Sequence, residues 1–457
     1  MYHPLIQKVL KLFQLIKLSN LICNNNMKYY NTNNPSQKVN LKNAVMKSSN
    51  DATGLYMPES IPTLNATFFK NIHQINLQEI SFQVANAMFA SDVPEDVLQR
   101  IINETLDFEI PLVNIHNNIS VLELFHGPTM AFKDIGARFM AGLLGYFIEQ
   151  DNHEINILAA TSGDTGSAVA AAFLNKPGIK VTILYPSNRV SYLQEQQLTT
   201  MGNNITALEI DGSFDDCQAL VKQAFADKNL NAIVNLASAN SINFARLFPQ
   251  SFYYFHAYAQ LNKNNKPLVF SVPSGNYGNL TAGLIAKKMG LPIHQFIAAT
   301  NANDIIPIYL QTKKFTPKPS IETISNAMDV GNPSNFGRIT SLYNYSFSDI
   351  QENIKGFSFN DHETRLTMKD LYKNSNYILD PHGAIGYLAL SKYLEKNEGQ
   401  GIFLETAHPA KFQDVVQSVL EIEMVIPEQL RKYIKKQKHS IKMSNNFHDL
   451  RDYLTSV

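Results

Sequence analysis

One lysine, Lys133, lies in a segment that could make its amine reactive. The segment is ELFHGPTMAFKD, residues 123–134, in which a glycine-proline turn and an apolar pair precede the lysine. A lysine that is partly desolvated and close to another cation loses its proton more readily and becomes a nucleophile. A surface lysine beside Asp134 explains the same residues and is the more frequent situation for this residue type. The segment therefore permits covalent chemistry at Lys133 without requiring it.

A glycine-rich turn in the second half of the chain has the composition of a phosphate-binding loop. The apolar run PLVFSVP leads into SGNYGN, residues 274–279, and a helix is expected directly afterwards. Two glycines let the backbone approach an anion closely, and the N–H groups of a helix N-terminus attract negative charge. The candidate residues are Gly275, Asn276, Tyr277, Gly278 and Asn279. A tight strand-to-helix turn that binds no ligand explains these residues about equally well.

A second junction has the same form, LAATSGDTGS at residues 158–167, followed by the small-residue run AVAAAF. Thr161, Ser162 and Thr165 add hydroxyl donors beside the amides of the expected helix start. Two such junctions in one sheet indicate a substrate and a cofactor that both carry phosphate or carboxylate. The chain has no GxGxxG and no Walker pattern, which argues against dinucleotide and nucleotide phosphate loops.

The elements that must position these residues follow an α/β rhythm. From about Leu112 onward, short β-branched runs alternate with amphipathic segments, which predicts parallel strands joined by crossover helices. The expected strands are INILAAT, KVTILYP, ITALEI, AIVNLAS, PLVFSVP, HQFIAATN and GIFLET. In such sheets ligands bind beyond the carboxyl ends of the strands, where both junctions fall.

The chain divides into regions of different composition. Residues 27–110 are mainly helical in pattern and predict a small N-terminal domain, and residues 111–425 form the catalytic α/β region, with polar insertions or a lid near 311–363. Residues 426–457 are lysine-rich and predict a helical terminal cover. Residues 1–26 form an extension that lacks the uninterrupted apolar run of a secretory signal. For it we expect translation to begin at Met27, with a targeting segment as the alternative.

Length and charge favour a multidomain enzyme with a small-molecule partner. At 457 residues the chain exceeds a single core, and its 39 basic and 39 acidic residues balance, which indicates neither a nucleic acid nor a membrane partner. The two cysteines, Cys23 and Cys217, form no CxxC or Cys/His cluster. We therefore expect no disulfide framework, no metal site and a reducing, cytoplasmic setting.

Six motifs taken together resemble those of threonine synthases, in the branch shared by many bacteria and fungi. In chain order they are LFHGPTMAFKD, ATSGDTGSA, SGNYGNLTAG, NAMDVGNPSN, DPHGAIGY and ETAHPAKF. The similarity covers nearly everything from Met27 to about Val425. That family lies in the tryptophan synthase beta-like superfamily and has the fold type II architecture of pyridoxal-phosphate enzymes. The resemblance implies an α/β fold with two parallel-sheet subdomains and a small N-terminal domain.

The resemblance also implies an activity and a cofactor. Members of the family are lyases that use pyridoxal 5'-phosphate to convert O-phospho-L-homoserine and water into L-threonine and phosphate. The reaction is a γ-elimination followed by β-addition of water, and it is the last step of threonine biosynthesis. We expect a monomer or a homodimer.

The motifs carry the family's site residues onto this sequence. Lys133 falls on the lysine that holds the cofactor as a Schiff base, and residues 275–279 fall on the loop that binds the cofactor phosphate. Thr406 falls on the hydroxyl that faces the pyridine nitrogen. Asp164 falls where many relatives of the fold have an asparagine near the phenolic oxygen. In NSINFAR, Asn243 and Arg246 are candidates for the substrate phosphate, with a helix cap and a surface arginine as an equal alternative.

Three readings of the function remain open. A threonine-synthase-like phospho-lyase would keep nearly all the cofactor motifs and would release a carbonyl product instead of threonine. A non-catalytic homologue that binds the cofactor would keep the fold, although the intact Lys133 and Thr406 argue against it. A serine or threonine dehydratase is less favoured, because its usual lysine context differs from HGPTMAFKD. Three histidines in the motifs, His126, His382 and His408, are expected to be structural.

Overall fold

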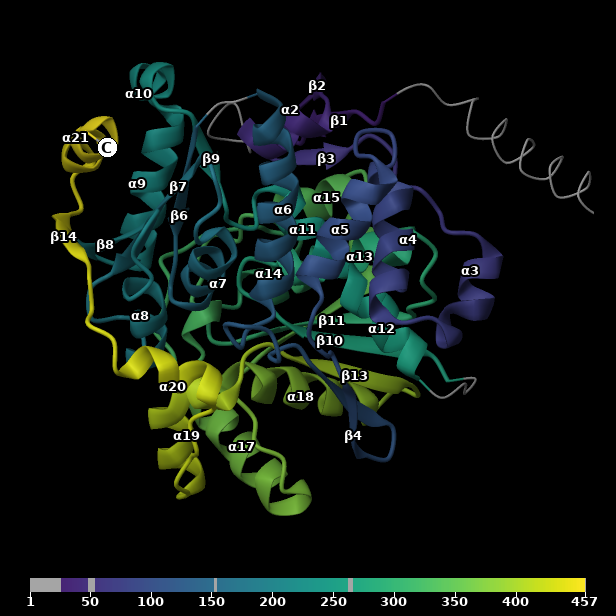
Figure 1. The fold of residues 1–457 in the computed structure, drawn as a ribbon. Helices are drawn as coiled ribbons and strands as arrows, with labels where there is room; N and C mark the ends of the chain where they lie inside the picture. The colour runs from purple at the N-terminus through teal and green to yellow at the C-terminus, as the bar shows by residue number, and fades with distance from the viewer. Residues whose placement is uncertain (1–25, 48–53, 152–153, 262–265, 457) are drawn as a thin grey trace, which may run out of the picture.

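The computed structural model describes residues 26–47, 54–151, 154–261 and 266–456 (Figure 1). The expectation about residues 1–26 falls, except for Asn26, outside the described residues. Cys23 lies there as well, and Cys217 is a buried free thiol.

The N-terminal region combines helices with a small antiparallel sheet. The sheet has the strand order β2-β1-β3 and is built from β1 (Tyr29–Asn31), β2 (Asn34–Val39) and β3 (Tyr56–Pro58). The helices are α2 (Leu41–Lys47), α3 (Ala66–Asn71), α4 (Leu77–Phe89) and α5 (Glu95–Thr105). Helix α4 coincides with the amphipathic run LQEISFQVANAMF. The small sheet was not predicted, because its strands are short and β2 carries mostly polar residues.

A six-stranded sheet forms the centre of the larger subdomain, with the strand order β12-β11-β10-β13-β5-β4. Its strands are β4 (Leu112–His116), β5 (Ile119–Glu123), β10 (Leu268–Pro273), β11 (Gln295–Thr300), β12 (Ile354–Ser358) and β13 (Gln400–Glu405). All neighbours are parallel except β4 and β5. One face packs on α17 (Asp361–Ser375), α18 (Pro381–Leu394) and α19 (Gln413–Leu420), which share one apolar cluster.

A five-stranded parallel sheet forms the smaller subdomain, with the order β14-β8-β7-β6-β9. Its strands are β6 (Ile155–Ala160), β7 (Ile179–Pro186), β8 (Ile205–Asp211), β9 (Leu236–Ser238) and β14 (Ile441–Ser444). Helices α9 (Phe214–Ala226), α10 (Lys228–Ile233) and α21 (Phe447–Ser456) share an apolar cluster with this sheet. The α/β fold with two parallel-sheet subdomains and an N-terminal domain is confirmed.

The remaining helices connect the strands and surround the sheets (Figure 1). They are α6 (Lys133–Asp151), α7 (Asp164–Phe173), α8 (Tyr192–Thr199), α11 (Phe244–Leu247), α12 (Phe252–Gln260), α13 (Gly278–Lys288), α14 (Ile305–Thr312), α15 (Phe336–Leu342), α16 (Phe347–Asn353) and α20 (Glu428–Ile434).

Two strands lie in regions expected to lack them. Strand β12 lies within the polar segment near 311–363, and β14 lies in the terminal region expected to be helical. Both are edge strands of only four or five residues, so one side of each stays unpaired. Such strands do not show the continuous apolar run of a strand that is covered on both faces.

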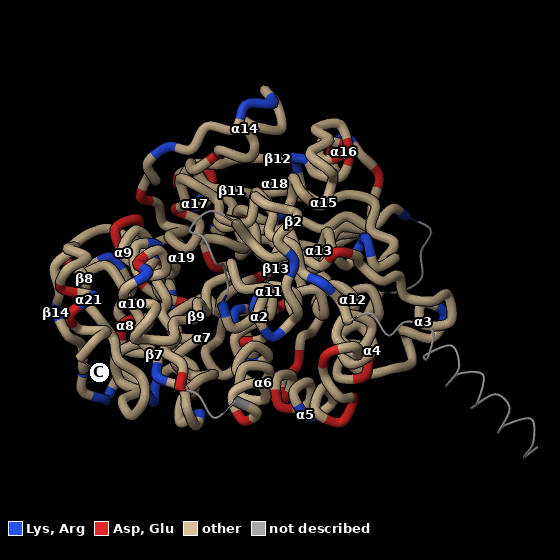
Figure 2. Tube along the Cα trace, turned by 90° about the horizontal axis from the view of Figure 1, so that it is seen from above, with Lys and Arg blue, Asp and Glu red and all other residues tan. Residues whose placement is uncertain are grey.

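Basic and acidic residues are interspersed over both subdomains (Figure 2). Across the described ranges, no helix combines the length and the apolar character needed to cross a membrane.

Candidate active site

A cavity lies where strands of both sheets end. Four strands, β6, β9, β10 and β13, lead into segments that line it, namely Ser162, Asn240–Ser241, Gly275–Asn279 and Thr406. In parallel sheets these carboxyl ends are the usual place for ligands, because backbone amides and helix starts converge there. The cavity therefore brings together both glycine-rich junctions and the lysine segment.

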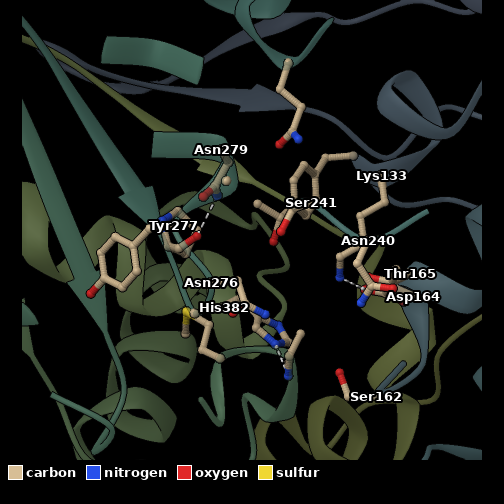
Figure 3. A pocket seen from close by; sticks show the side chains of 18 of the residues that line it. Lys133, Ser162, Asp164, Thr165, Asn240, Ser241, Asn276, Tyr277, Asn279 and His382 are labelled. Carbon is tan, nitrogen blue, oxygen red and sulfur yellow. Dashed lines mark hydrogen bonds and ion pairs between the residues drawn. The ribbon is translucent and has the colours of Figure 1, made fainter. Parts of the chain in front are cut away.

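Lys133 is the first residue of α6, and its backbone is fixed to the end of β13. The Phe132 N–H donates to the Thr406 carbonyl at 2.9 Å, and Ala131 bridges Ala407. The Arg246 Nη1 donates to the Lys133 carbonyl at 2.8 Å. These bonds aim the lysine side chain into the cavity (Figure 3).

The surroundings of Lys133 favour its uncharged form. Its side chain is 15% exposed, and its Nζ lies 3.6 Å from Asp164 Oδ2. Burial lowers the pKa of Lys133, Asp164 opposes this, and the charges of Lys411 and Arg246 lower it further, so the net shift is downward. A lowered pKa makes the amine available as a nucleophile and as a base near neutral pH.

Asp164 begins α7 and contacts two lysines. Its Oδ1 lies 2.7 Å from Lys411 Nζ and accepts a hydrogen bond from Gln194 Nε2 at 2.8 Å. Burial alone would raise the pKa of Asp164, but the ion pairs with Lys411 and Lys133 hold it well below its ordinary value. Neither Lys411 nor Gln194 was predicted, although Lys411 lies inside the quoted motif ETAHPAKF.

The loop between β10 and α13 has the geometry of an anion cradle. Tyr277 adopts a left-handed conformation with φ of 59°, and α13 begins at the next residue, so the N–H groups of its first turn have no carbonyl partner within the helix. Asn279 closes the loop, since its Nδ2 donates to the Pro273 carbonyl at 2.8 Å. A Cβ at Gly275 would lie 2.9 Å from the Ala327 carbonyl oxygen, so the neighbouring segment needs a glycine there.

His382 fixes the segment that faces this loop. Its Nδ1 contacts Asp380 Oδ1 at 2.6 Å, and its Nε2 accepts a hydrogen bond from the Ala327 N–H at 3.2 Å. Only a neutral imidazole with its proton on Nδ1 makes both contacts. His382 also lines the cavity, so this expected structural histidine holds the cavity wall at residues 325–330.

Two further side chains leave polar groups at the cavity. Thr406 is buried directly after β13 and lines the cavity. The Asn240 Nδ2 donates to the Ala160 carbonyl at 2.9 Å, while its buried Oδ1 has no hydrogen-bond partner among the residues that the structure describes. A buried acceptor without a partner fits a ligand that brings a donor.

The predicted substrate residues divide into two groups. Ser162, Thr165 and Arg246 line the cavity. Thr161 and Asn243 do not, because the fold uses their polar atoms. The Thr161 Oγ1 accepts from the N–H groups of Gly163 and Gly166 at 3.0 and 2.8 Å.

Asn243 is a capping residue of the short helix α11. Its Oδ1 accepts from the Ala245 N–H at 3.0 Å, and its Nδ2 donates to the Val45 and Ser238 carbonyls at 2.8 and 3.1 Å. The helix-cap alternative therefore describes its position. Arg246 is also largely buried, and burial lowers the pKa of its guanidinium to about 10.

These residues fit a phosphorylated aldehyde cofactor. An amine with a lowered pKa, an anion cradle at a helix N-terminus and a hydroxyl at a strand end surround one cavity. A family model described as pyridoxal-phosphate dependent enzyme matches residues 111–402. Models described as threonine synthase N terminus and threonine synthase, C-terminal match residues 28–106 and 383–454.

Individual proteins agree with these matches. A threonine synthase from Haemophilus influenzae is 45% identical over 429 residues, covering 94% of this chain and 99% of that protein. The crystal structure of threonine synthase from Escherichia coli is similar with a TM-score of 0.90 at 40% identity, covering 94% of this chain and 100% of that one. The pyridoxal-phosphate-bound threonine synthase from Brucella melitensis gives a TM-score of 0.86 at 32% identity, covering 94% and 99%.

Fold and site together define a pyridoxal-phosphate-dependent enzyme of fold type II. Its cofactor is pyridoxal 5'-phosphate, as the resemblance implied. Within that class, the chain belongs to the threonine synthase family, and it is a lyase.

Proposed function

We propose that the enzyme converts O-phospho-L-homoserine and water into L-threonine and phosphate, with Lys133 as the residue that binds the cofactor covalently. The observation that carries this proposal is that the Lys133 side chain lines the same cavity as two helix starts, those of α7 and α13. We propose that the N-terminus of α13 binds the cofactor phosphate and that the N-terminus of α7 binds an anionic group of the substrate.

The residues of the cavity wall have separate tasks. The loop of residues 275–279 would hold the cofactor phosphate, and Thr406 would offer its hydroxyl to the ring nitrogen. When bound, the cofactor withdraws electron density from the substrate carbons next to the amine. A neutral hydroxyl does not keep the ring nitrogen protonated as a carboxylate would, so this withdrawal is moderate. Moderate withdrawal suits chemistry that proceeds stepwise at the β and γ carbons.

Lys133 moves the protons of the reaction. Its Nζ lies at the cavity, where it would remove the proton from the substrate Cα and later return one there. The lowered pKa of Lys133 supports this role, because the amine must be uncharged to accept a proton.

The substrate is held by groups that line the remaining wall. Ser162 and Thr165, at the start of α7, offer hydroxyl groups beside backbone amides. Arg246 adds positive charge beside Lys133, to whose carbonyl it donates. We propose that these three residues bind the anionic groups of the substrate. Asp164 is proposed to lie beside the cofactor's phenolic oxygen.

We also propose a cytoplasmic enzyme that is a monomer or a homodimer. Cys217 is a buried free thiol, as is usual for proteins of reducing compartments, and this supports the cytoplasmic assignment.

Product analysis tests the function directly. Purified enzyme with pyridoxal phosphate is given O-phospho-L-homoserine, and threonine, phosphate and keto acids are measured in the same sample. We expect equal amounts of threonine and phosphate from the wild type and from Lys392→Ala, an exposed lysine on α18. Lys133→Ala is expected to form neither product. Phosphate with a keto acid and no threonine would replace this proposal by a phospho-lyase.

A further inference from the structure

A second lysine, Lys411, is buried beside the proposed cofactor lysine. It lies in the 3-10 turn Pro409–Phe412, shortly after Thr406, and its side chain is fully buried. Its Nζ lies 2.7 Å from Asp164 Oδ1 and donates to the Thr129 carbonyl at 2.9 Å. A buried ammonium is costly unless it is paired and hydrogen-bonded, and Lys411 has both an ion-pair partner and a hydrogen-bond acceptor.

The same carboxylate faces both lysines, but unequally. Lys411 contacts Asp164 at hydrogen-bond distance, whereas Lys133 Nζ lies 3.6 Å from the other oxygen of that carboxylate. The Asp164 oxygen facing Lys411 is held in place by Gln194 Nε2 at 2.8 Å. Of the two ammonium groups, that of Lys411 therefore has the stronger interactions.

Three cationic side chains, Lys133, Lys411 and Arg246, lie close together at the cavity, and Asp164 and Asp134 are carboxyl groups near them. Asp134 is turned to Thr129, from whose N–H and hydroxyl it accepts hydrogen bonds at 2.9 and 2.6 Å. The charges of Lys411 and Arg246 oppose a charge on Lys133, so loss of a proton from the most weakly bound of the three cations relieves the repulsion.

We propose that Lys411 is a positioning residue that holds the Asp164 carboxylate and thereby leaves Lys133 as the lysine that gives up its proton. The inference rests on the proposed role of Lys133 as the cofactor lysine. The negative charge of Asp164 is paired with Lys411, so it does not hold Lys133 in the ammonium form.

Substitutions of Lys411 and of Asp164 change the protonation of Lys133 in opposite directions. In Lys411→Met, Asp164 keeps Lys133 as its only lysine partner, so Lys133 stays protonated to higher pH. Adding Asp164→Asn removes the negative charge as well, so the amine of Lys133 returns toward its wild-type behaviour. The effect of the first substitution therefore disappears in the double variant.

The test measures the protonation of Lys133 in the apoenzyme. Wild type and variants, freed of cofactor, are labelled briefly with acetic anhydride between pH 6 and 10, and the peptide that carries Lys133 is quantified by mass spectrometry. We expect the midpoint of labelling to rise by about one pH unit or more in Lys411→Met. It should lie near the wild-type value in Lys411→Met/Asp164→Asn and in Lys438→Met, which removes a lysine paired with Glu195 at 2.7 Å outside the cavity.

Each outcome decides the inference. A midpoint in Lys411→Met at or below that of the wild type overturns it, as does a double variant that stays shifted. If Lys411→Met does not fold, Lys411→Gln keeps a donor without the charge and is expected to show the same rise. Labelling reports on Lys133 whether or not threonine is formed. A shift without threonine formation therefore contradicts only the proposed function, and an unshifted variant of an enzyme that forms threonine contradicts only the role of Lys411.

Discussion

At the scale of single residues, a buried carboxyl pair supports the histidine that lines the cavity. The Asp380 N–H donates to Glu405 Oε1 at 2.7 Å, and Asp380 Oδ1 contacts His382. Their other oxygens, Glu405 Oε2 and Asp380 Oδ2, have no hydrogen-bond partner within the described part of the chain. Burial raises the pKa of Glu405 well above its ordinary value, and the Asp380 carboxylate raises it further. The protonated, uncharged form of Glu405 is therefore favoured in the folded protein.

Protonation of Glu405 makes stability depend on pH. The pKa of Glu405 is raised in the folded state, so its stabilising contribution is complete below the unfolded value of 4.5 and is lost as pH rises toward the folded one. We expect the free energy of unfolding of the wild type to fall as the pH rises above 4.5, by on the order of 1 kcal/mol per pH unit until the pKa of the folded state is reached. Glu405→Gln, which keeps a donor toward Asp380, should flatten the curve.

Denaturant unfolding at several pH values measures how the free energy of unfolding depends on pH. The exposed Glu398→Gln on the surface serves as the control and should follow the wild type. Parallel curves for Glu405→Gln and the wild type would show that Glu405 is ionised in the folded protein.

The sequence motifs identified many of the residues that line the cavity. They did not indicate which contacts each side chain makes. Lys133, Asp164, residues 275–279 and Thr406 all line one cavity, as the motifs implied. Lys411 was overlooked because an ammonium on a surface and one buried against a carboxylate look alike in a sequence. Thr161 was misplaced for a similar reason, since its hydroxyl binds the backbone of its own turn.

At the scale of elements, the turn from β10 to α13 shows how a short loop is shaped by its neighbours. Gly275 lies against the backbone of Ala327 and Met328, and both would be 2.9 Å from an added Cβ. The contact atoms belong to backbone, so they cannot move aside as a flexible side chain would. The loop is therefore fixed by the segment that His382 holds.

Gly275→Ala is expected to weaken cofactor binding. Overpacking of this kind costs about 1–3 kcal/mol, which corresponds to a loss of affinity of about 5-fold to 150-fold if the cost falls on the bound state. Titration of the apoenzyme with pyridoxal phosphate measures the change. Gly145→Ala in α6 is the matched control, because an added Cβ there meets nothing within 4 Å and should slightly stabilise the helix. Unchanged affinity in Gly275→Ala would show that the loop adapts.

The buried strands were easier to predict than the edges of the sheets. Strands β6, β7, β8, β10, β11 and β13 coincide with apolar runs, since they are covered on both faces. Strand β14, IKMS, is exposed along most of its length and pairs on one side only. Its partner is more than two hundred residues away in sequence, so no local pattern indicates the pairing.

At the scale of the whole molecule, the C-terminal region ties the two subdomains together. Helix α19 packs on the six-stranded sheet, α20 packs near Leu193 of α8, and β14 then joins the five-stranded sheet. In Figure 1 this path runs along the lower left side of the molecule in yellow. Helix α21 completes it by inserting Leu450 and Leu454 into the apolar cluster of the smaller subdomain.

Leu450→Ala should show how much this attachment contributes. Leu450 is completely buried, and its truncation is expected to lower the free energy of unfolding by about 2–5 kcal/mol. Leu366→Ala on α17 is the control, because Leu366 is 47% exposed and its loss should cost about 0.5 kcal/mol or less. Equal unfolding midpoints for the two variants would mean that α21 does not contribute to the stability of the subdomain.

The most direct test of the account is to locate the cofactor on the chain. Purified holoenzyme is reduced with borohydride, which makes the covalent link permanent, and is then digested and analysed by mass spectrometry. The account predicts the phosphopyridoxyl group on Lys133 and none on Lys411, the other lysine buried against Asp164. The group on Lys411, or on any lysine outside the cavity, would contradict both the proposed function and the assignment of the site.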